Sequence, residues 1–540
     1  MAALVTAGAA ALWATPAMAD PPLPDPGWVT PLSSEIQHLH FRYGPLHIPA
    51  GQNLILIGPV TIEKPAYDGY MIAFRPNMVD ANGVAPPTEV VHLHHGVFLN
   101  LSNTDMTSGG AQRFAGTGEE KTVLESQYPY GYFVRGSDVW ALNYMLHNET
   151  PDEQTVWITY DVDYVPANTP LGRKIKPVTP VWMDVQNGSA YPVFDVHRGS
   201  GTNGEYTYPE QANPYTYKGK PLNQWTVPQD GTVVATAGHV HPGGLYTDVD
   251  VTRPGTKPAV PRRSCRRVRS RSHRRGHRAR ARVRCRAAPP GPIPGHEPGS
   301  VRLFRSHAHY FDPAGPLSWD LAMERTPNDW HPLLRKGDRL SESATYETRL
   351  GSWYESMGIN ILYVAFGDRS GTDPFTHTLD QNGFDTHGHL RENNNYGGLP
   401  VAGAVDPTKQ ANGATIANGV AITGFQYLPG GLGLPGGAGL PPVIHQGEQL
   451  DFGNFDAAAQ IFHTITACRA PCNQSTGIAF PVANGPIDFD SGDLGSGPNG
   501  FTAAANREDW KTPANLAPGT YTYFCRIHPF MRGAFRVVAK

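Results

Sequence analysis

The chain has 540 residues, enough for two to four domains with cores of their own, and carries a formal net charge of −3. This balanced charge gives no reason to expect a nucleic-acid partner, and after the first residues no apolar run is long enough to span a membrane. Glycine (59) and proline (51) are plentiful, and Thr/Val/Tyr-rich segments alternate with Pro-Gly turns, which predicts a mostly β chain.

The amino terminus predicts export. Met1 to Trp13 form a short apolar stretch, and Ala17-Met-Ala19 is a small-x-small cleavage pattern before Asp20. An apolar core of this length is typical of a secretory signal peptide rather than a membrane span. We therefore predict a signal peptide over residues 1–19 and a mature protein that is secreted or periplasmic.

Turn-separated β segments divide the rest of the chain into units. Gln52–Gly58 and Thr155–Asp161 are typical strand sequences of the first unit. A Gly/Asn-rich stretch near residue 395 is typical of a linker. We predict an N-terminal β-sandwich at 28–175, a second at 176–375, a linker at 376–417 and a final β-sandwich at 418–540.

An arginine tract interrupts the second unit. Thirteen of the 25 residues from Arg262 to Arg286 are arginine, and Cys265 and Cys285 lie among them. Such a tract ordinarily indicates an anionic partner, but it has no interleaved aromatic residues and breaks β-patterned sequence on both sides. We interpret it as a reading-frame error or a disordered insertion, which resequencing of the DNA would decide.

Histidines form four close groups in the first two units and the linker. On a strand, residues i and i+2 share a face, so a His-x-His pair can present two imidazoles to one metal ion. Hydrogen-bonded histidines in or beside a β core are the alternative. The groups are His92-Leu-His-His95, His239-Val-His241, His307-Ala-His309 and His387-Gly-His389.

The last unit carries a more specific pattern. Cys525, His528 and Met531 lie in one short segment between two strand-like runs, and His463 lies upstream in an alternating apolar run. A thiolate, two imidazoles and a weak axial thioether are the ligands of a mononuclear type 1 (blue) copper site. Loss of the metal from such a fold is the alternative.

Two further cysteines follow His463. Cys468 and Cys472 flank a short proline-containing loop. In an oxidising compartment we expect them to form a small-loop disulfide, and the alternative is two unpaired thiols.

The final 120 residues or so resemble the cupredoxins, and the loop Cys525–Gly533 resembles that of amicyanin and plastocyanin. The resemblance implies a Greek-key β-sandwich, with His463, Cys525 and His528 as strong copper ligands and Met531 as the axial one. Multicopper oxidases carry His-Cys-His here, whereas Phe524 and Arg526 flank this cysteine. An oxygen-reducing centre wired through the neighbours of Cys525 is therefore not expected.

Residues 30–370 resemble the copper type II, ascorbate-dependent monooxygenases, the peptidylglycine and dopamine hydroxylases. That resemblance implies two jelly-roll domains and two copper sites, formed here by two sets of residues. A regular strand would pair His92 with His94, so a site using adjacent histidines requires a bulge or a strand end. The implied ligand sets are His94, His95 and His147, and His239, His241 and Met357.

The sequence therefore predicts an all-β protein: two jelly-roll-like β-sandwiches followed by a cupredoxin Greek-key β-sandwich. Its predicted function is copper binding with one-electron transfer, feeding type 2 copper for oxygen-dependent hydroxylation, with a redox protein or small reductant as partner. A non-enzymatic copper-binding or buffering protein is the alternative. No acid/base pair or nucleophile constellation suggests hydrolysis.

Overall fold

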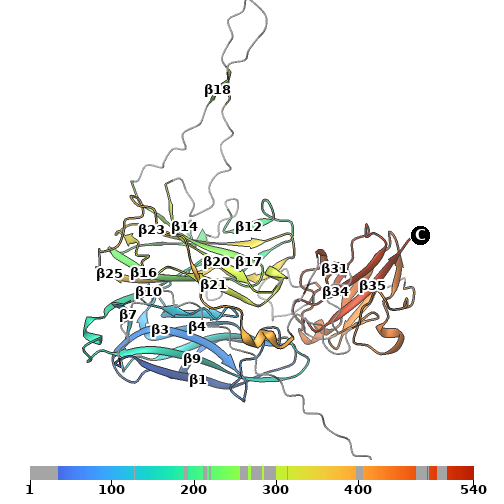
Figure 1. The fold of residues 1–540 in the computed structure, drawn as a ribbon, viewed down its shortest axis with the longest axis horizontal. Helices are drawn as coiled ribbons and strands as arrows, with labels where there is room; N and C mark the ends of the chain where they lie inside the picture. Colours follow the sequence, from blue (N-terminus) through green and yellow to red (C-terminus); the bar gives the residue numbers. More distant parts are fainter. Residues whose placement is uncertain are drawn as a thin grey trace, which may run out of the picture.

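Strands make up nearly all regular structure of the described residues in this computed structural model, so the prediction of an all-β chain built from β-sandwiches is confirmed. Figure 1 shows two stacked units, coloured blue to yellow, and the C-terminal unit in orange and red beside them. Short 3₁₀ turns complete the described elements: η1 (Gly172–Lys174), η2 (Gly315–Leu317), η3 (Arg391–Tyr396), η4 (Gly436–Gly439) and η5 (Asp456–Ala459). The structure describes residues 34–126, 128–187, 192–210, 216–217, 220–255, 266–268, 282–284, 299–312, 314–396, 405–416, 419–469, 483, 486–495 and 507–540.

The first unit packs two sheets face to face. Apolar side chains on the facing sides of the strands meet between the sheets, where the rings of Phe74 and Phe98 have centroids 4.6 Å apart. One sheet contains β1 (Gln37–Ile48), β9 (Gln154–Pro166), β3 (Gly69–Val79), β6 (Leu124–Glu125) and β7 (Tyr130–Val134). The other contains β2 (Asn53–Ile62), β8 (Trp140–Asn148), β4 (Val91–Thr104) and β5 (Ala111–Gly118).

The second unit continues the larger sheet of the first. Lys176 of β10 pairs in parallel with Tyr130 of β7, and the other edge of β10 pairs with β25. Its core includes Val249 and Leu362, both fully buried. In order, its main strands are β10 (Lys176–Asp184), β25 (Ile359–Phe366), β16 (Gly231–His239), β21 (Leu321–Arg325), β20 (Val301–Tyr310), β17 (Gly244–Thr252), β23 (Arg339–Glu347) and β12 (Glu205–Tyr208). Hydrogen bonds thus cross the predicted division at 175/176, and that division stays a prediction.

Shorter strands complete this half. They are β15 (Gln224–Thr226), β22 (Leu333–Leu334) and β26 (Phe384–Asp385), with the pairs β11 (Phe194–Val196) with β24 (Trp353–Ser356) and β13 (Thr216–Tyr217) with β14 (Lys220–Pro221). Within the arginine tract, β18 (Arg266–Val268) pairs with β19 (Arg282–Arg284). The other residues of the tract, with Cys265 and Cys285, lie outside the described residues, as does the predicted signal peptide.

The C-terminal unit is a sandwich of a four-stranded and a five-stranded sheet. Phe452 and Tyr523 join the two sheets across the core, with ring centroids 5.2 Å apart. One sheet contains β28 (Gln426–Leu428), β27 (Val420–Thr423), β30 (Asp451–Asn454) and β33 (Asp509–Lys511). The other contains β29 (Val443–His445), β35 (Arg532–Val538), β34 (Gly519–Phe524), β31 (Thr466–Arg469) and β32 (Ile487–Asp490).

No helix among the described residues has the length and apolar character needed to cross a membrane.

Candidate metal centres

The C-terminal candidate site lies at one end of the last sandwich. Cys525 directly follows β34, and the loop to β35 carries His528 and Met531. The Met531 N–H donates to the His528 carbonyl at 2.8 Å, and the Cys525 N–H donates to the Met531 carbonyl at 3.1 Å. His463 arrives just before β31, the neighbour of β34 in the same sheet. The sheet pairing and the tight loop together bring residues 62 positions apart to one point.

Three ligand atoms converge at that point. The Cys525 Sγ lies 3.7 Å from the His528 Nδ1 and 3.9 Å from the His463 Nδ1, and the two nitrogens are 3.1 Å apart. These separations suit a small ion inside the triangle at typical metal–nitrogen and metal–sulfur distances of about 2.0–2.3 Å. Met531 is buried in the same core cluster as Cys525, and its role as axial ligand stays a prediction.

Backbone hydrogen bonds would stabilise negative charge on the Cys525 sulfur. The N–H groups of Thr464 and His528 donate to the Cys525 Sγ at 3.2 and 3.3 Å. Burial nevertheless raises the pKa of the Cys525 thiol to about 12. The thiolate therefore depends on a cation at the site, which is the behaviour of a metal-ligating cysteine.

A carboxylate orients one of the imidazoles. The His463 Nε2 lies 3.0 Å from the Asp456 Oδ2, an arrangement in which Nε2–H donates and the Nδ1 lone pair faces Cys525. Burial opposes ionisation of Asp456, but hydrogen bonds from His463 and from the backbone of Phe425 and Gly424 lower its pKa to about 2. Burial also lowers the pKa of His463, partly offset by Asp456, which favours the neutral, ligating imidazole.

The N-terminal half covers the second imidazole. His528 is completely buried, and a Cβ at Gly51 of the first unit would lie 3.3 Å from its Nε2. Pro529 is buried and Phe530 is half-buried. Gly51, which lies against the His528 ring, belongs to the same chain.

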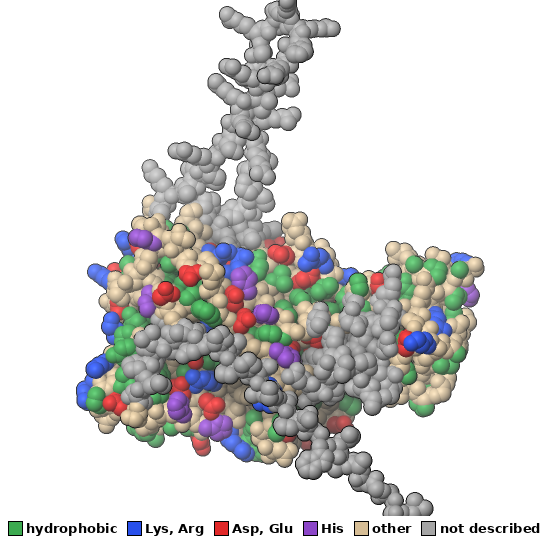
Figure 2. All heavy atoms as spheres, viewed as in Figure 1, with side chains coloured by type: hydrophobic (Ala, Val, Ile, Leu, Met, Phe, Trp, Pro, Cys, Tyr) green, Lys and Arg blue, Asp and Glu red, His purple; other side chains and the backbone are tan. Residues whose placement is uncertain are grey.

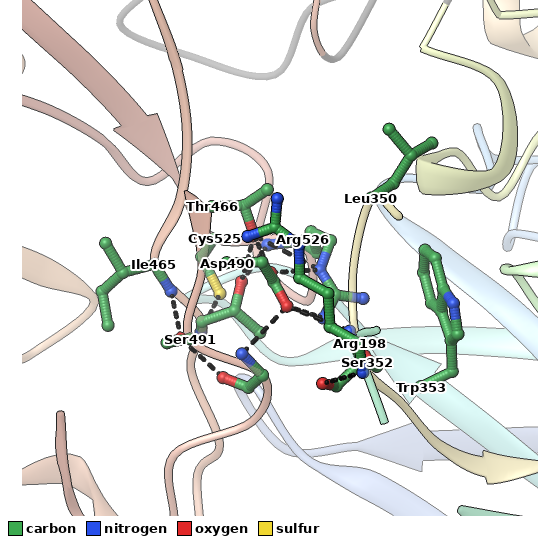
Figure 3. A network of polar contacts seen from close by, with 12 residues as sticks. Arg198, Leu350, Ser352, Trp353, Ile465, Thr466, Asp490, Ser491, Cys525 and Arg526 are labelled. Carbon is green, nitrogen blue, oxygen red and sulfur yellow. Dashed lines mark hydrogen bonds and ion pairs between the residues drawn. The ribbon is translucent and has the colours of Figure 1, made fainter. Parts of the chain in front are cut away.

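Arg526 connects the loop between β34 and β35 (residues 525–531, the cysteine loop) to the second unit. Its guanidinium donates to the Asp490 Oδ1 at 3.1 Å and to the Ser352 carbonyl at 2.9 Å, and it lies over the Trp353 ring at 4.7 Å (Figure 3). The Asp490 side chain is fully covered and that of Arg526 is 10% exposed, so separating them would leave an uncompensated charge. The neighbour of the candidate ligand Cys525 is thus a connection between units.

Six buried histidines form a second candidate centre between the first two units. Three lie on β4, one on β8, one at the end of β16 and one just beyond it. His92 pairs directly with His147 across β4 and β8, and the register shifts between Leu93 and His95. This irregularity is the bulge that use of adjacent histidines requires. The members of this histidine cluster are His92, His94, His95, His147, His239 and His241, each at most 9% exposed.

The rings of the histidine cluster lie in contact. The ring centroid of His94 lies 4.1 Å from that of His147 and 3.9 Å from that of His241. The His239 and His241 centroids are 5.0 Å apart. Two triplets have ligand atoms within 4.8 Å of one another: His92, His94 and His147, and His94, His95 and His241.

Burial keeps five of these imidazoles, those of His92, His94, His95, His147 and His241, neutral. Burial lowers the pKa of His92 to about 4 and of His95 to about 3. It also lowers the pKa of His94, His147 and His241 well below the ordinary value, and neighbouring histidines add to the effect. Neutral imidazole is the form that ligates a metal ion.

Buried carboxylates surround the histidine cluster. Glu149 lies 3.5 Å from the His147 Nδ1 and Glu119 lies 3.6 Å from the His94 Nδ1. Glu120 Oε1 is 3.0 Å from the His239 Nδ1, without hydrogen-bond geometry. Burial raises the pKa of Glu119 and Glu149 well above the usual range. A cation among these groups would offset the cost of burying them.

Trp319 joins the histidine cluster to the cysteine loop. Its ring lies 4.3 Å from that of His92, centroid to centroid, and its Nε1–H donates to the Arg526 carbonyl at 3.3 Å. The indole thus contacts a cluster histidine and also the carbonyl of Arg526, the residue after Cys525.

Two cavities border the histidine cluster. One of about 110 Å³ is lined by His94, His147 and His241 and, from the C-terminal unit, by Arg526 and Ile527. The other, of about 410 Å³, has largely apolar walls that include Trp182, Ile359 and Ile361. His95, His239 and Met357 also line this larger cavity.

The structure brings together most of the predicted site residues but groups them differently. His463, Cys525 and His528 form one close group. His94 and His147 are joined by His92, which the predicted sets omit, and His94 also groups with His95 and His241. The resemblance implied a ligand pair of adjacent histidines and so selected His95 with His94. The i, i+2 spacing of His92 and His94 was nevertheless visible in the sequence.

The remaining predicted features lie elsewhere. His307 and His309 contact Glu324 and Asp385, and His389 contacts Asp320. Within the described residues neither these histidines nor His387 belong to a close metal-ligating group. Cys468 is disulfide-bonded, but Cys472 lies outside the described residues, so their pairing stays a prediction. Trp319 carried no sequence signal.

Comparisons with known proteins give little further information. No family model and no curated protein matches this chain. Among solved structures, a copper-containing nitrite reductase (NirK) from Thermus scotoductus SA-01 is similar over 57% of this chain, with 14% sequence identity and a TM-score of 0.14. The similarity spans 55% of the length of that reductase chain.

Proposed function

We propose that this chain is an exported copper protein whose C-terminal unit holds type 1 copper for one-electron transfer. The convergence of the Cys525 Sγ with the Nδ1 atoms of His463 and His528 carries the proposal. One thiolate and two imidazoles, with Met531 as a weak axial ligand, would hold copper in both of its oxidation states. Copper bound there would supply reversible one-electron chemistry.

The residues around this site support electron transfer rather than substrate turnover. Asp456 and the sheet hold His463 in place, and the backbone N–H groups of Thr464 and His528 orient the sulfur. A donor set fixed before and after a change in charge needs little rearrangement. Complete burial of Cys525 and His528 excludes water from the donor atoms.

We propose further that the histidine cluster binds type 2 copper and receives electrons from the C-terminal unit for oxygen-dependent hydroxylation. The cluster offers neutral imidazoles, and the larger cavity beside His95 and His239 has room for a small, mostly apolar substrate. The contact of Trp319 with both His92 and the Arg526 carbonyl supports electron delivery between the two centres. Burial of all six histidines argues against the copper-buffering alternative, because a buffer must exchange its metal readily.

Metal analysis with electron paramagnetic resonance and oxygen uptake tests this proposal. We expect intense blue absorption, a type 1 signal, further copper in the histidine cluster, and oxygen consumption when a reductant such as ascorbate is supplied. A type 1 signal with no oxygen uptake would leave an electron carrier and remove the hydroxylation. A copper-loaded protein without blue absorption would overturn the electron-transfer function.

A further inference from the structure

The histidine cluster contains more imidazoles than the two predicted ligand sets use. His92 belongs to neither set, yet its ring lies 5.0 Å from that of His147 and 5.9 Å from that of His94, centroid to centroid. His94 stacks on His147 at 4.1 Å, and its ligand atom also lies within 4.8 Å of those of His95 and His241. These contacts define one compact triplet: His92, His94 and His147.

The other three histidines of the cluster are His95, His239 and His241. His239 and His241 have ring centroids 5.0 Å apart. A Cβ at Gly118, the residue that pairs with His95 across β4 and β5, would lie 2.7 Å from the His239 Cε1. His95 and His239 also line the same cavity. His95 therefore belongs with His239 and His241 rather than with His147.

In each group of three, a hydrogen bond fixes the tautomer of one histidine, so its other ring nitrogen is available as a metal ligand. The Nδ1 of His92 lies 2.7 Å from the Thr88 carbonyl, and the Nδ1 of His241 lies 2.8 Å from the Glu355 carbonyl. Because a carbonyl only accepts, each Nδ1 carries the proton and each Nε2 has a lone pair. The Nε2 atoms of His92 and His241 and both ring nitrogens of His147 are buried without a hydrogen-bond partner. Such atoms are costly unless something else binds them.

We propose that the histidine cluster is a pair of adjacent three-histidine copper sites, one formed by His92, His94 and His147 and the other by His95, His239 and His241. This division gives each ion three imidazoles without sharing a ligand, whereas the close triplet of His94, His95 and His241 would share His94 with the first site. The 3.9 Å separation between the His94 and His241 rings places the two sites side by side. Met357, which lines the cavity with His95 and His239, would face the second site. The assignment of copper to both sites rests on the proposed function.

Counting bound copper in histidine variants tests this division. The full chain is loaded with cupric sulfate, dialysed and analysed for copper, with blue absorption and circular dichroism as checks on folding. H92Q is expected to bind one copper ion fewer than the wild type, and H92Q/H147Q also one fewer. H95Q/H147Q is expected to bind two fewer. H40Q, a change at a histidine with 62% side-chain exposure, is the control and should bind the wild-type amount.

The original ligand sets give a different result. They predict full copper binding by H92Q and the loss of one ion by H95Q/H147Q, and either outcome would overturn the proposed division. In the wild type, two neighbouring cupric ions should weaken or broaden each other's paramagnetic signals, and H92Q should reveal an isolated type 2 signal. Two undisturbed type 2 signals in the wild type would contradict adjacency. Absence of blue absorption in the wild type would count against the proposed type 1 site and leave these counts readable.

Discussion

The two candidate centres differ in how far apart in the sequence their residues lie. Cys525 and His528 come from a single loop, and the segment just before the neighbouring strand β31 supplies His463. The histidine cluster takes residues from three strand regions in two units, with 149 positions between its first and last members. Both are buried groups of potential metal ligands. A centre built within one loop can be recognised from spacing, whereas a centre assembled between units requires the packing of those units.

Replacing the sulfur should separate the two centres most sharply. Cys525→Ser keeps the size of the side chain but replaces the soft donor with a hydroxyl, so the intense blue absorption should disappear completely. Copper in the histidine cluster should be retained, since Cys525 is not among its ligands. Visible spectra with copper analysis would check both. Blue absorption that survives the change would show that another residue supplies the sulfur.

A smaller effect is expected when the partner of His463 is altered. Asp456→Asn removes the carboxylate that accepts from the His463 Nε2. Loss of such a supporting contact typically costs about 10–100-fold in metal affinity. Competition with a copper chelator would measure the change at the type 1 site. Asp451→Asn, at a half-exposed position of the same unit, is the matched control and should leave the affinity unchanged.

Replacing Trp319, which connects the two centres, should have a smaller effect than the two changes above. Trp319→Phe keeps an aromatic ring against His92 but removes the hydrogen bond to the Arg526 carbonyl. Electron transfer from the reduced type 1 site to the histidine cluster should slow severalfold, while the blue absorption stays unchanged. Rapid reduction followed by absorption spectroscopy would give the rate. The control is Trp330→Phe, a buried tryptophan whose Nε1–H donates to the Leu303 carbonyl. An equal rate in wild type and Trp319→Phe would exclude this route.

The sequence predicted the C-terminal centre in detail because alternation and loop spacing act locally. A cysteine at the end of one strand and a histidine before its neighbour must meet when the strands pair. The tautomer of His463 was not predictable, since Asp456 reaches it only through the turn formed by η5.

The histidine cluster was only partly predictable. The motifs contained its members, but the ligand sets implied by the resemblance omitted His92, and β4 carries a register shift between Leu93 and His95. Strand spacing cannot reveal such a shift. The contact between His94 and His241 also depends on how the first unit packs against the second. For the same reason Trp319, near the short turn η2, could not be recognised.

The most direct test of the central claim is an anomalous difference map from copper-loaded crystals, measured at the copper absorption edge. We predict a strong peak within bonding distance of the Cys525 Sγ and the Nδ1 atoms of His463 and His528. A map with no peak among these three atoms, from crystals in which Cys525 is reduced, would contradict the account.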